Sequence, residues 1–344
     1  MTRDDVRALL RPNIARLTPY STARDDYKGS LGVFLDANES PYPTGFNRYP
    51  DPHQKVLKSR LSEIKGLPVE NIFIGNGSDE AIDMVFRVFC NPGVDNVVAI
   101  APSYGMYSVC AAINDIALRE VLLEEDFSLD TDKLLRACDE HTKAIFLCSP
   151  NNPSGNAFPR EQLIEIVRRS GAMVIVDEAY VDFSEIPSIR KEVLSEPNLI
   201  VYQTLSKAWG MAGLRLGLAF ADEEVIARFS QVKYPYNISA LTQKTVLEAL
   251  QKPIDAQVKE IVTERARVAK ALEGMPCVKN VYPSQANFLL VKVSDADALY
   301  DALVKEGVIV RNRSRVPLCK QCLRITIGLK EENEKMLATV KSFK

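Results

Sequence analysis

Histidine and tryptophan are scarce in this sequence of 344 residues, which contains two histidines and one tryptophan. The histidines, His53 and His141, lie far apart, and the chain has no H-E-x-x-H motif and no paired C-x-x-C units. A protein-held catalytic zinc or a Ser-His-Asp triad is hard to build from so few imidazoles. We therefore expect neither a metal centre nor such a triad.

A disulfide framework is also missing, because the seven cysteines are odd in number and irregularly spaced. The N-terminus alternates charged residues where a signal peptide would be apolar, and no apolar run approaches the ~20 residues of a membrane span. These features predict a soluble protein of the reducing cytoplasm.

Excess charge of either sign is lacking too. Lys plus Arg number 43 against 45 Asp plus Glu, so the net charge of −2 gives no field for holding nucleic acid. The 46% hydrophobic and 26% charged residues are typical of a globular chain, and the length suggests about two domains.

What the sequence does contain is an alternation of short apolar runs with longer segments of helical period. This rhythm predicts an α/β fold whose large domain has a mostly parallel sheet covered by helices. The expected strands are residues 71–75, 96–100, 143–148, 173–176, 199–203 and 216–220. The clearest helices between them are residues 80–90, 104–113 and 160–170.

After residue 236 the rhythm changes to two long helical segments, 239–250 and 254–272, and then to strands. The latter are expected at residues 278–282, 287–293, 308–311 and 322–327. We therefore predict an N-terminal arm (1–44) that packs on the small unit, a large domain (45–238) and a small α+β domain (239–344). Prolines crowd the end of the arm, where they exclude a continuous helix.

Polar residues collect at the carboxyl ends of the predicted strands, where open α/β sheets bind ligands. In the segment GNGSDE, residues 75–80, the glycines allow a tight turn. Gly77, Ser78 and Asp79 could present backbone amides to an anion. The same residues also suit an ordinary helix start capped by Ser78.

Asp177 ends the apolar run 173–176 and begins the motif DEAY. A carboxylate held there could pair with a buried cation, such as a protonated pyridine nitrogen, or bind magnesium. The chain has no G-x-x-x-x-G-K-[ST] motif to accompany a magnesium site. A helix-capping role for Asp177 fits equally well.

Lys207 lies in a turn rich in Ser, Gly and Ala, directly after the strand 199–203. An amine there could approach a carbonyl carbon closely, and Arg215 could clamp a phosphate. Most lysines are merely solvated surface charges. The co-occurrence with Tyr104, Asn152 and Tyr180 favours the functional interpretation.

In this order and spacing, the motifs SPNNPSG, DEAY and TLSKAWGMAGLRLG resemble those of the fold-type I, class II aminotransferases, from about residue 17 to the C-terminus. The resemblance implies a pyridoxal 5'-phosphate cofactor bound covalently by Lys207, which also moves the reacting proton. Asp177 would keep the pyridine nitrogen protonated. Asn152 and Tyr180 would bond the phenolic oxygen, and Tyr104 would stack on the ring.

For the cofactor's phosphate, the resemblance implies Ser206, Arg215 and the backbone amides of residues 77–79. Tyr49, in the motif RYP, would reach the phosphate bound by a second subunit. The family pattern thus implies a homodimer with shared sites.

The chain ends, with LTPYSTAR (17–24), LDANESP (35–41), NRYP (47–50) and CLRITIG (322–328), resemble the histidinol-phosphate aminotransferase branch of this family. That branch moves an amino group between L-histidinol phosphate and 2-oxoglutarate in L-histidine biosynthesis. Both substrates carry anions, and we expect Tyr20, Asn38, Arg311 and Arg324 to bind them. Arg313 and Arg315 are read as a solvated loop.

Three alternatives remain at this point. An aromatic amino acid aminotransferase of the same fold could use the same pocket. A relative that decarboxylates threonine phosphate would release carbon dioxide. A cofactor-binding transcription regulator would need a DNA-binding domain, for which the residues before 38 are too few and too neutral. The C-x-x-C pair at 319–322 precedes a strand and is not expected to be a redox site.

Overall fold

The computed structural model of the chain describes residues 1–22 and 32–343. Its larger part is built on a seven-stranded sheet of order β1-β7-β6-β5-β4-β2-β3, in which only β7 runs antiparallel to its neighbours. The predicted mostly parallel sheet is confirmed. The strands are β1 (Ile72–Asn76), β2 (Asn96–Ala101), β3 (Ala117–Leu122), β4 (Thr142–Cys148), β5 (Met173–Asp177), β6 (Leu199–Thr204) and β7 (Leu216–Ala221).

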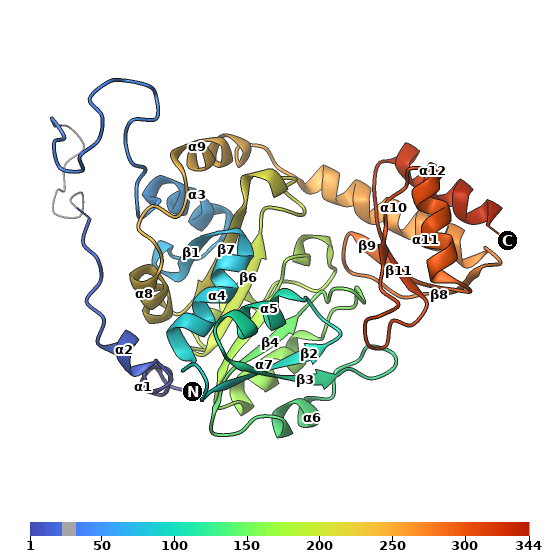
Figure 1. Cartoon of the computed structure of the whole chain (residues 1–344), viewed down its shortest axis with the longest axis horizontal. Helices are drawn as coiled ribbons and strands as arrows, with labels where there is room; N and C mark the ends of the chain where they lie inside the picture. Colours follow the sequence, from blue (N-terminus) through green and yellow to red (C-terminus); the bar gives the residue numbers. More distant parts are fainter. Residues whose placement is uncertain (23–31, 344) are drawn as a thin grey trace.

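Helices cover both faces of this sheet (Figure 1). Successive residues of one strand enter different hydrophobic clusters: Ile74 joins one cluster and Phe73 the other. Because both faces are buried, the strands read as continuous apolar runs, which is why the sequence revealed them. The helices of this part are α3 (Lys55–Lys65), α4 (Gly77–Phe89), α5 (Met106–Ile113), α6 (Thr131–Arg136), α7 (Arg160–Arg169), α8 (Glu223–Val232) and α9 (Ala240–Ala249).

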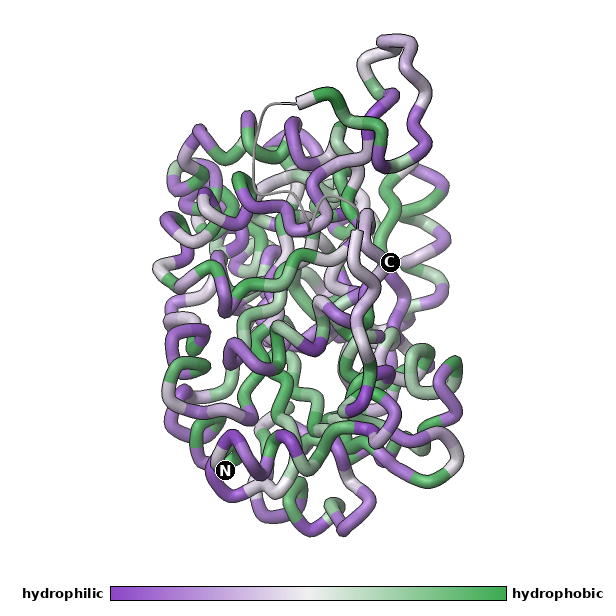
Figure 2. The backbone as a smooth tube through the Cα atoms, turned by 90° about the vertical axis from the view of Figure 1, so that its left-hand side faces the viewer, coloured by the Kyte–Doolittle hydropathy of each residue, from purple (hydrophilic) through white to green (hydrophobic). Residues whose placement is uncertain are grey.

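Strand β3 was not predicted. It pairs with β2 alone at the edge of the sheet and exposes most of its residues, so its sequence ALREVL mixes polar with apolar positions. In Figure 2, hydrophobic (green) segments run mostly through the interior, and hydrophilic (purple) segments lie mostly around the outside.

The smaller part has a four-stranded antiparallel sheet of order β10-β11-β9-β8. Its elements are α10 (Asp255–Glu273), β8 (Val278–Val281), β9 (Phe288–Val293), α11 (Ala296–Lys305), β10 (Arg311–Asn312), β11 (Cys322–Thr326) and α12 (Lys330–Ser342). The expected strand 308–311 is present only as the short β10.

The predicted start of this unit at residue 239 is too early. Helix α9 packs against α3, with Val246 and Leu250 in a core cluster of the large sheet.

The N-terminal arm does not pack on the small unit, contrary to the prediction. Helices α1 (Arg3–Ala8) and α2 (Pro12–Ala15) lie on the large domain, where Val6 and Ile14 enter the core beside α4 and α8. Arg3 also forms an ion pair with Asp222 (2.9 Å). These contacts bury the arm's apolar side chains. The described residues 32–44 lie on the opposite side of the molecule from α11 and α12 (Figure 1).

Candidate active site

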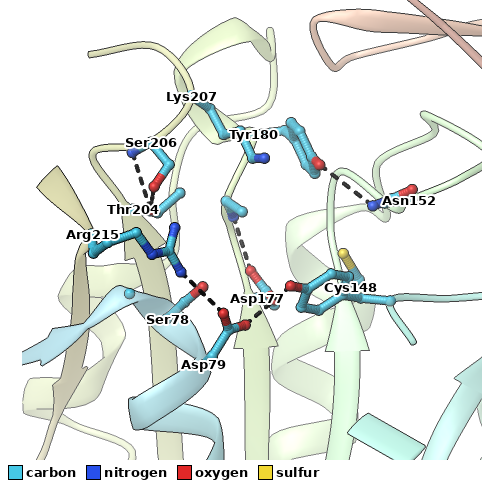
Figure 3. Close-up of a pocket in the computed structure, with 13 residues that line it drawn as sticks. Ser78, Asp79, Cys148, Asn152, Asp177, Tyr180, Thr204, Ser206, Lys207 and Arg215 are labelled. Carbon is cyan, nitrogen blue, oxygen red and sulfur yellow. Dashed lines mark hydrogen bonds and ion pairs between the residues drawn. The ribbon is translucent and has the colours of Figure 1, made fainter. Parts of the chain in front are cut away.

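A pocket opens at the carboxyl ends of β4, β5 and β6, as expected for this sheet. Figure 3 shows the side chains that converge on it. They come from segments far apart in the sequence, which the parallel strands bring to one edge. The lining residues are Gly77, Ser78, Asp79, Tyr104, Cys148, Asn152, Asp177, Ala179, Tyr180, Thr204, Ser206, Lys207 and Arg215. All the predicted cofactor-binding residues except Tyr49 are among them.

The anion-binding end of the pocket depends on close backbone packing. The backbone N–H of Gly77 donates to the carbonyl of Arg215 (2.7 Å), and Gly77 has a φ of +74°. A Cβ on Gly77 would lie 2.6 Å from Arg215 Nη2, and one on Gly217 would lie 2.2 Å from the Ser78 nitrogen. Only glycine fits at either position. The guanidinium of Arg215 is thereby held beside the N-terminus of α4, which favours a bound anion.

The expected Ser78 cap does not form. The helix begins at Gly77, with Asn76 as its N-cap residue, and Asn76 makes no side-chain cap bond. Arg215 Nη2 instead contacts Asp79 Oδ2 (3.2 Å), and Asp79 Oδ1 accepts the Tyr104 hydroxyl (3.0 Å). Asp79 therefore orients two of the predicted cofactor ligands.

Asp177 and Lys207 provide the two groups of opposite charge. Asp177 is almost fully buried, and this burial raises its pKa to about 6. Two donors hold its carboxylate: the Tyr107 hydroxyl (2.9 Å) and the Ala179 N–H (3.0 Å). Burial, followed by the nearby Arg324 charge, lowers the pKa of Lys207. A lysine with a lowered pKa is a better nucleophile at neutral pH.

Tyr180, Asn152 and Arg324 form a chain of contacts across the pocket. Lys207 Nζ lies 5.5 Å from the centre of the Tyr180 ring, and the Asn152 side-chain amide donates to the Tyr180 hydroxyl (3.4 Å). Arg324, on β11 of the small unit, donates from Nη1 to Asn152 Oδ1 (2.5 Å). The small sheet thus brings a cation to a pocket built on the large one.

Positive charge gathers around Arg324. The β10–β11 pairing sets Arg311 opposite Arg324, and both line a second cavity together with Arg315. Arg313 is half-buried with its Nε unpartnered, so it is not simply solvated as expected, whereas Arg315 is exposed. Burial, with the charges of Arg313 and Arg311, lowers the pKa of Arg324. In the described part of the chain none of these arginines pairs with a carboxylate.

Three predicted site residues line neither this pocket nor the second cavity: Tyr20, Asn38 and Tyr49. Tyr20 is 75% exposed, and Asn38 is also exposed. Tyr49 is half-exposed and stacks on Tyr236 at 4.4 Å between ring centres. Ala23 and Arg24, which end the motif LTPYSTAR, lie outside the described residues.

Sequence reasoning missed Tyr107, Thr204, Cys148 and Ala179. Tyr107 was placed in the helix 104–113 but was given no role. Its spacing of three from Tyr104 would put both on one face of that predicted helix, although α5 begins only at Met106. Thr204 Oγ1 accepts the backbone N–H of Ser206 (3.1 Å) and so shapes the turn that carries Lys207. That role depends on backbone geometry, which the sequence pattern did not reveal.

Among residues 1–22 and 32–343, no three His, Cys, Asp or Glu side chains gather as metal ligands would. Nor does any helix in these ranges have the length and apolar character needed to cross a membrane. All seven cysteines are free, and Cys319 and Cys322 are both buried.

Comparison with known proteins shows the family of the chain. Residues 35–340 match the family model of aminotransferase class I and II. Over 342 residues the chain is 54% identical to a histidinol-phosphate aminotransferase of Parabacteroides distasonis, covering 99% of each chain. It is 52% identical over 341 residues to the one of Bacteroides thetaiotaomicron, covering 98% of this chain and 99% of that relative.

A solved histidinol-phosphate aminotransferase of Sinorhizobium meliloti, in complex with pyridoxal-5'-phosphate, has the same fold. It superposes with a TM-score of 0.77 at 24% sequence identity and covers 89% of both chains. The chain therefore belongs to the class I and II aminotransferase family, as the sequence motifs indicated. Within that family, the relatives just compared over almost the whole chain are histidinol-phosphate aminotransferases.

Proposed function

We propose that this chain transfers an amino group between L-histidinol phosphate and 2-oxoglutarate, giving imidazole acetol phosphate and L-glutamate in L-histidine biosynthesis. The two nearly full-length relatives named for this activity support the proposal. The observation that carries it is the joint presence of the Lys207–Asp177 pocket and, beside it, the guanidinium of Arg324, which contacts Asn152 but no carboxylate of the described residues.

The residues of the pocket fit pyridoxal 5'-phosphate. A buried carboxylate, a lysine with a lowered pKa and a glycine-lined cradle with an arginine match its pyridine nitrogen, aldehyde and phosphate. When bound, the cofactor accepts the amino group and delocalises the electrons released at the substrate carbon.

Lys207 and Asp177 perform the central steps. Lys207 would hold the cofactor covalently through its amine and would carry the proton that leaves the substrate carbon. The burial that lowers its pKa makes the neutral amine available for this step. Asp177 keeps the pyridine nitrogen protonated by offering it a buried negative charge.

The other lining residues position the ring. Asn152 and Tyr180 would bind its phenolic oxygen, and Tyr104 would stack on its face. The hydroxyl of Ser206, the guanidinium of Arg215 and the amides of residues 77–79 would bind the phosphate. Their contacts with Asp79 and with one another, described above, fix these groups before a ligand enters.

The substrate anion binds on the small-unit side. Arg324 and Arg311 converge there from paired strands, and their charges lack carboxylate partners among the described residues. A phosphate or a dicarboxylate supplies the missing negative charge. Tyr20 and Asn38, which are exposed in this chain, are the further residues that we propose for binding the substrate.

We further propose that the protein is a homodimer, in which Tyr49 reaches the cofactor phosphate of the partner's site. In this chain Tyr49 is outside its own pocket, and the segment before it exposes large apolar side chains. Val33 and Leu35 are each 89% exposed. Such apolar exposure is characteristic of a surface that another chain covers.

The free cysteines are consistent with a reducing compartment, and we place the enzyme in the cytoplasm.

Steady-state kinetics with competing donors tests the activity. We expect a higher kcat/KM for L-histidinol phosphate than for phenylalanine or tyrosine, since only the former brings a phosphate to the arginines. A clear preference for phenylalanine would identify an aromatic amino acid aminotransferase. Release of carbon dioxide from threonine phosphate would identify the decarboxylase.

A further inference from the structure

Tyr107 lies directly behind the pocket, at the base of Asp177. The tyrosine is on α5, is 1% exposed and does not line the pocket. Its hydroxyl donates to Asp177 Oδ2 (2.9 Å), while the backbone N–H of Ala179 donates to Oδ1 (3.0 Å). Each carboxylate oxygen therefore has one donor from the protein.

We propose that Tyr107 is a positioning residue for the amino-transfer reaction, which keeps the Asp177 carboxylate ionised and oriented toward the pyridine nitrogen of the cofactor. This inference rests on the proposed function, because it requires that the pocket bind pyridoxal phosphate.

The electrostatics around Asp177 show why a donor is needed. Burial disfavours a carboxylate, and the charge of Asp79 on α4 adds to that cost, so the pKa of Asp177 is raised. Among the described residues, the groups that chiefly act in the opposite direction are the Tyr107 hydroxyl, the Ala179 amide and the Lys207 amine. The Cys148 thiol on β4 also faces the carboxylate and stays neutral, because burial raises its pKa.

Lys207 cannot serve as the permanent counter-charge, because its amine reacts with the cofactor. The Ala179 amide is fixed in the backbone of the DEAY segment. Tyr107 is therefore the side chain that sustains the ionised form of Asp177 throughout the reaction.

Packing fixes the Tyr107 hydroxyl in place. The ring stacks on Phe146 at 4.9 Å between centres and meets Tyr104 edge-on at 5.8 Å. Tyr104 is the residue proposed to stack on the cofactor, and its own hydroxyl binds Asp79. One buried ring thus contacts both the carboxylate and the aromatic side chain that would hold the cofactor.

The test compares Tyr107→Phe with Tyr202→Phe, a matched control. Tyr202 is also fully buried in the same hydrophobic cluster, but its hydroxyl donates to the backbone carbonyl of Ala81 (2.7 Å) and not to Asp177. The readout is the affinity of each apoprotein for pyridoxamine 5'-phosphate, titrated from pH 5 to 8.5. This ligand lacks the aldehyde, so Lys207 makes no covalent bond to it.

We expect Tyr107→Phe to bind pyridoxamine phosphate roughly tenfold more weakly at neutral pH than the wild type does. Removing a donor from the charged form raises the pKa of Asp177 further. The pH below which affinity is lost should therefore move upward in Tyr107→Phe and stay at the wild-type position in Tyr202→Phe. A purely structural role would weaken binding without moving that midpoint.

A double-mutant cycle with Asp177→Asn gives a second measurement of the interaction between Tyr107 and Asp177. The double variant also remains informative if Tyr107→Phe alone folds poorly, because Asp177→Asn removes the buried charge that would be left without its donor. In the Asp177→Asn background, adding Tyr107→Phe should change the affinity less than twofold. An unmoved midpoint, or an equal loss in both backgrounds, would overturn the role of Tyr107. If the wild-type apoprotein binds neither pyridoxamine phosphate nor pyridoxal phosphate, the proposed function fails with it.

Discussion

The pocket at the strand ends and the segment around Tyr49 contribute to one proposed site in contrasting ways. Asp177, Lys207 and Arg215 are held by buried strands and by glycine-dependent turns of their own domain. Tyr20, Asn38 and Tyr49 lie on exposed chain that carries uncovered apolar side chains. The cofactor end of the site is thus preformed within one chain, whereas the substrate-covering end requires another surface.

The largest effect should come from the preformed part. Lys207→Ala removes the covalent attachment and the proton carrier together, so turnover should fall by roughly 10³-fold or more. Non-covalent cofactor binding should persist, because the cradle at Gly77 and Arg215 is untouched. Assays of turnover and of cofactor content test both points, with the exposed Lys292→Ala as control. Substantial residual turnover would remove Lys207 from its proposed role.

Asp177→Asn should lower kcat/KM by roughly 10²- to 10³-fold, because it leaves a buried pyridinium without its counter-charge.

The same substitution should increase the folding stability of the apoprotein at neutral pH. The folded-state pKa of Asp177, about 6, lies above the ordinary value of 3.8. Its stabilising contribution is therefore complete below pH 3.8 and is lost as the pH rises through 6.

At pH 7.5 the Asp177→Asn apoprotein should consequently be more stable than the wild type, by up to about 3 kcal/mol. Urea unfolding of both apoproteins at pH 4 and 7.5 measures this gain, which should shrink at pH 4. A less stable variant at pH 7.5 would show that burial does not strain this carboxylate.

Arg324→Gln tests the junction between the two regions. We expect the KM for L-histidinol phosphate to rise roughly 10- to 100-fold, the value of a charge-assisted hydrogen bond in a partly buried site. Lys320→Gln, on the exposed loop of the same unit and outside the second cavity, is the matched control and should change little. Equal effects of the two substitutions would indicate a general field in place of a specific contact.

The smallest effect is expected for Tyr49→Phe, which removes one hydrogen bond to the phosphate and should speed cofactor loss roughly fivefold. Tyr42→Phe, on the same exposed segment, is the control. Mixed dimers of one Tyr49→Phe chain and one Lys207→Ala chain sharpen the test. The site of the Tyr49→Phe chain then has an intact Lys207 and receives the intact Tyr49 of the other chain, so it should hold the cofactor normally. Unchanged retention in Tyr49→Phe dimers would contradict the contact.

The sequence allowed the large sheet to be predicted well, because its strands are buried on both faces and followed by polar motifs. Asp177 and Lys207 were found for that reason. Strand β3 was missed since its edge position leaves polar residues exposed, and the packing of the arm was assigned wrongly. Val6 and Ile14 find their partners on α4 and α8 through tertiary contacts that no local pattern encodes.

Tyr107 shows a second limit of prediction from the sequence, namely contacts between residues far apart in the chain. Its position on α5 could be predicted, but its bond to Asp177 joins residues 70 positions apart. Such a contact depends on how α5 lies over the sheet, which local periodicity does not determine.

The visible absorption spectrum of the purified protein tests the central claim most directly. It should be recorded alone, after adding L-histidinol phosphate, and again after adding 2-oxoglutarate. The proposed function predicts that the band of the lysine-bound cofactor disappears with the donor and returns with the acceptor. A band bleached by phenylalanine but not by histidinol phosphate, or no band even after incubation with pyridoxal phosphate, would contradict it.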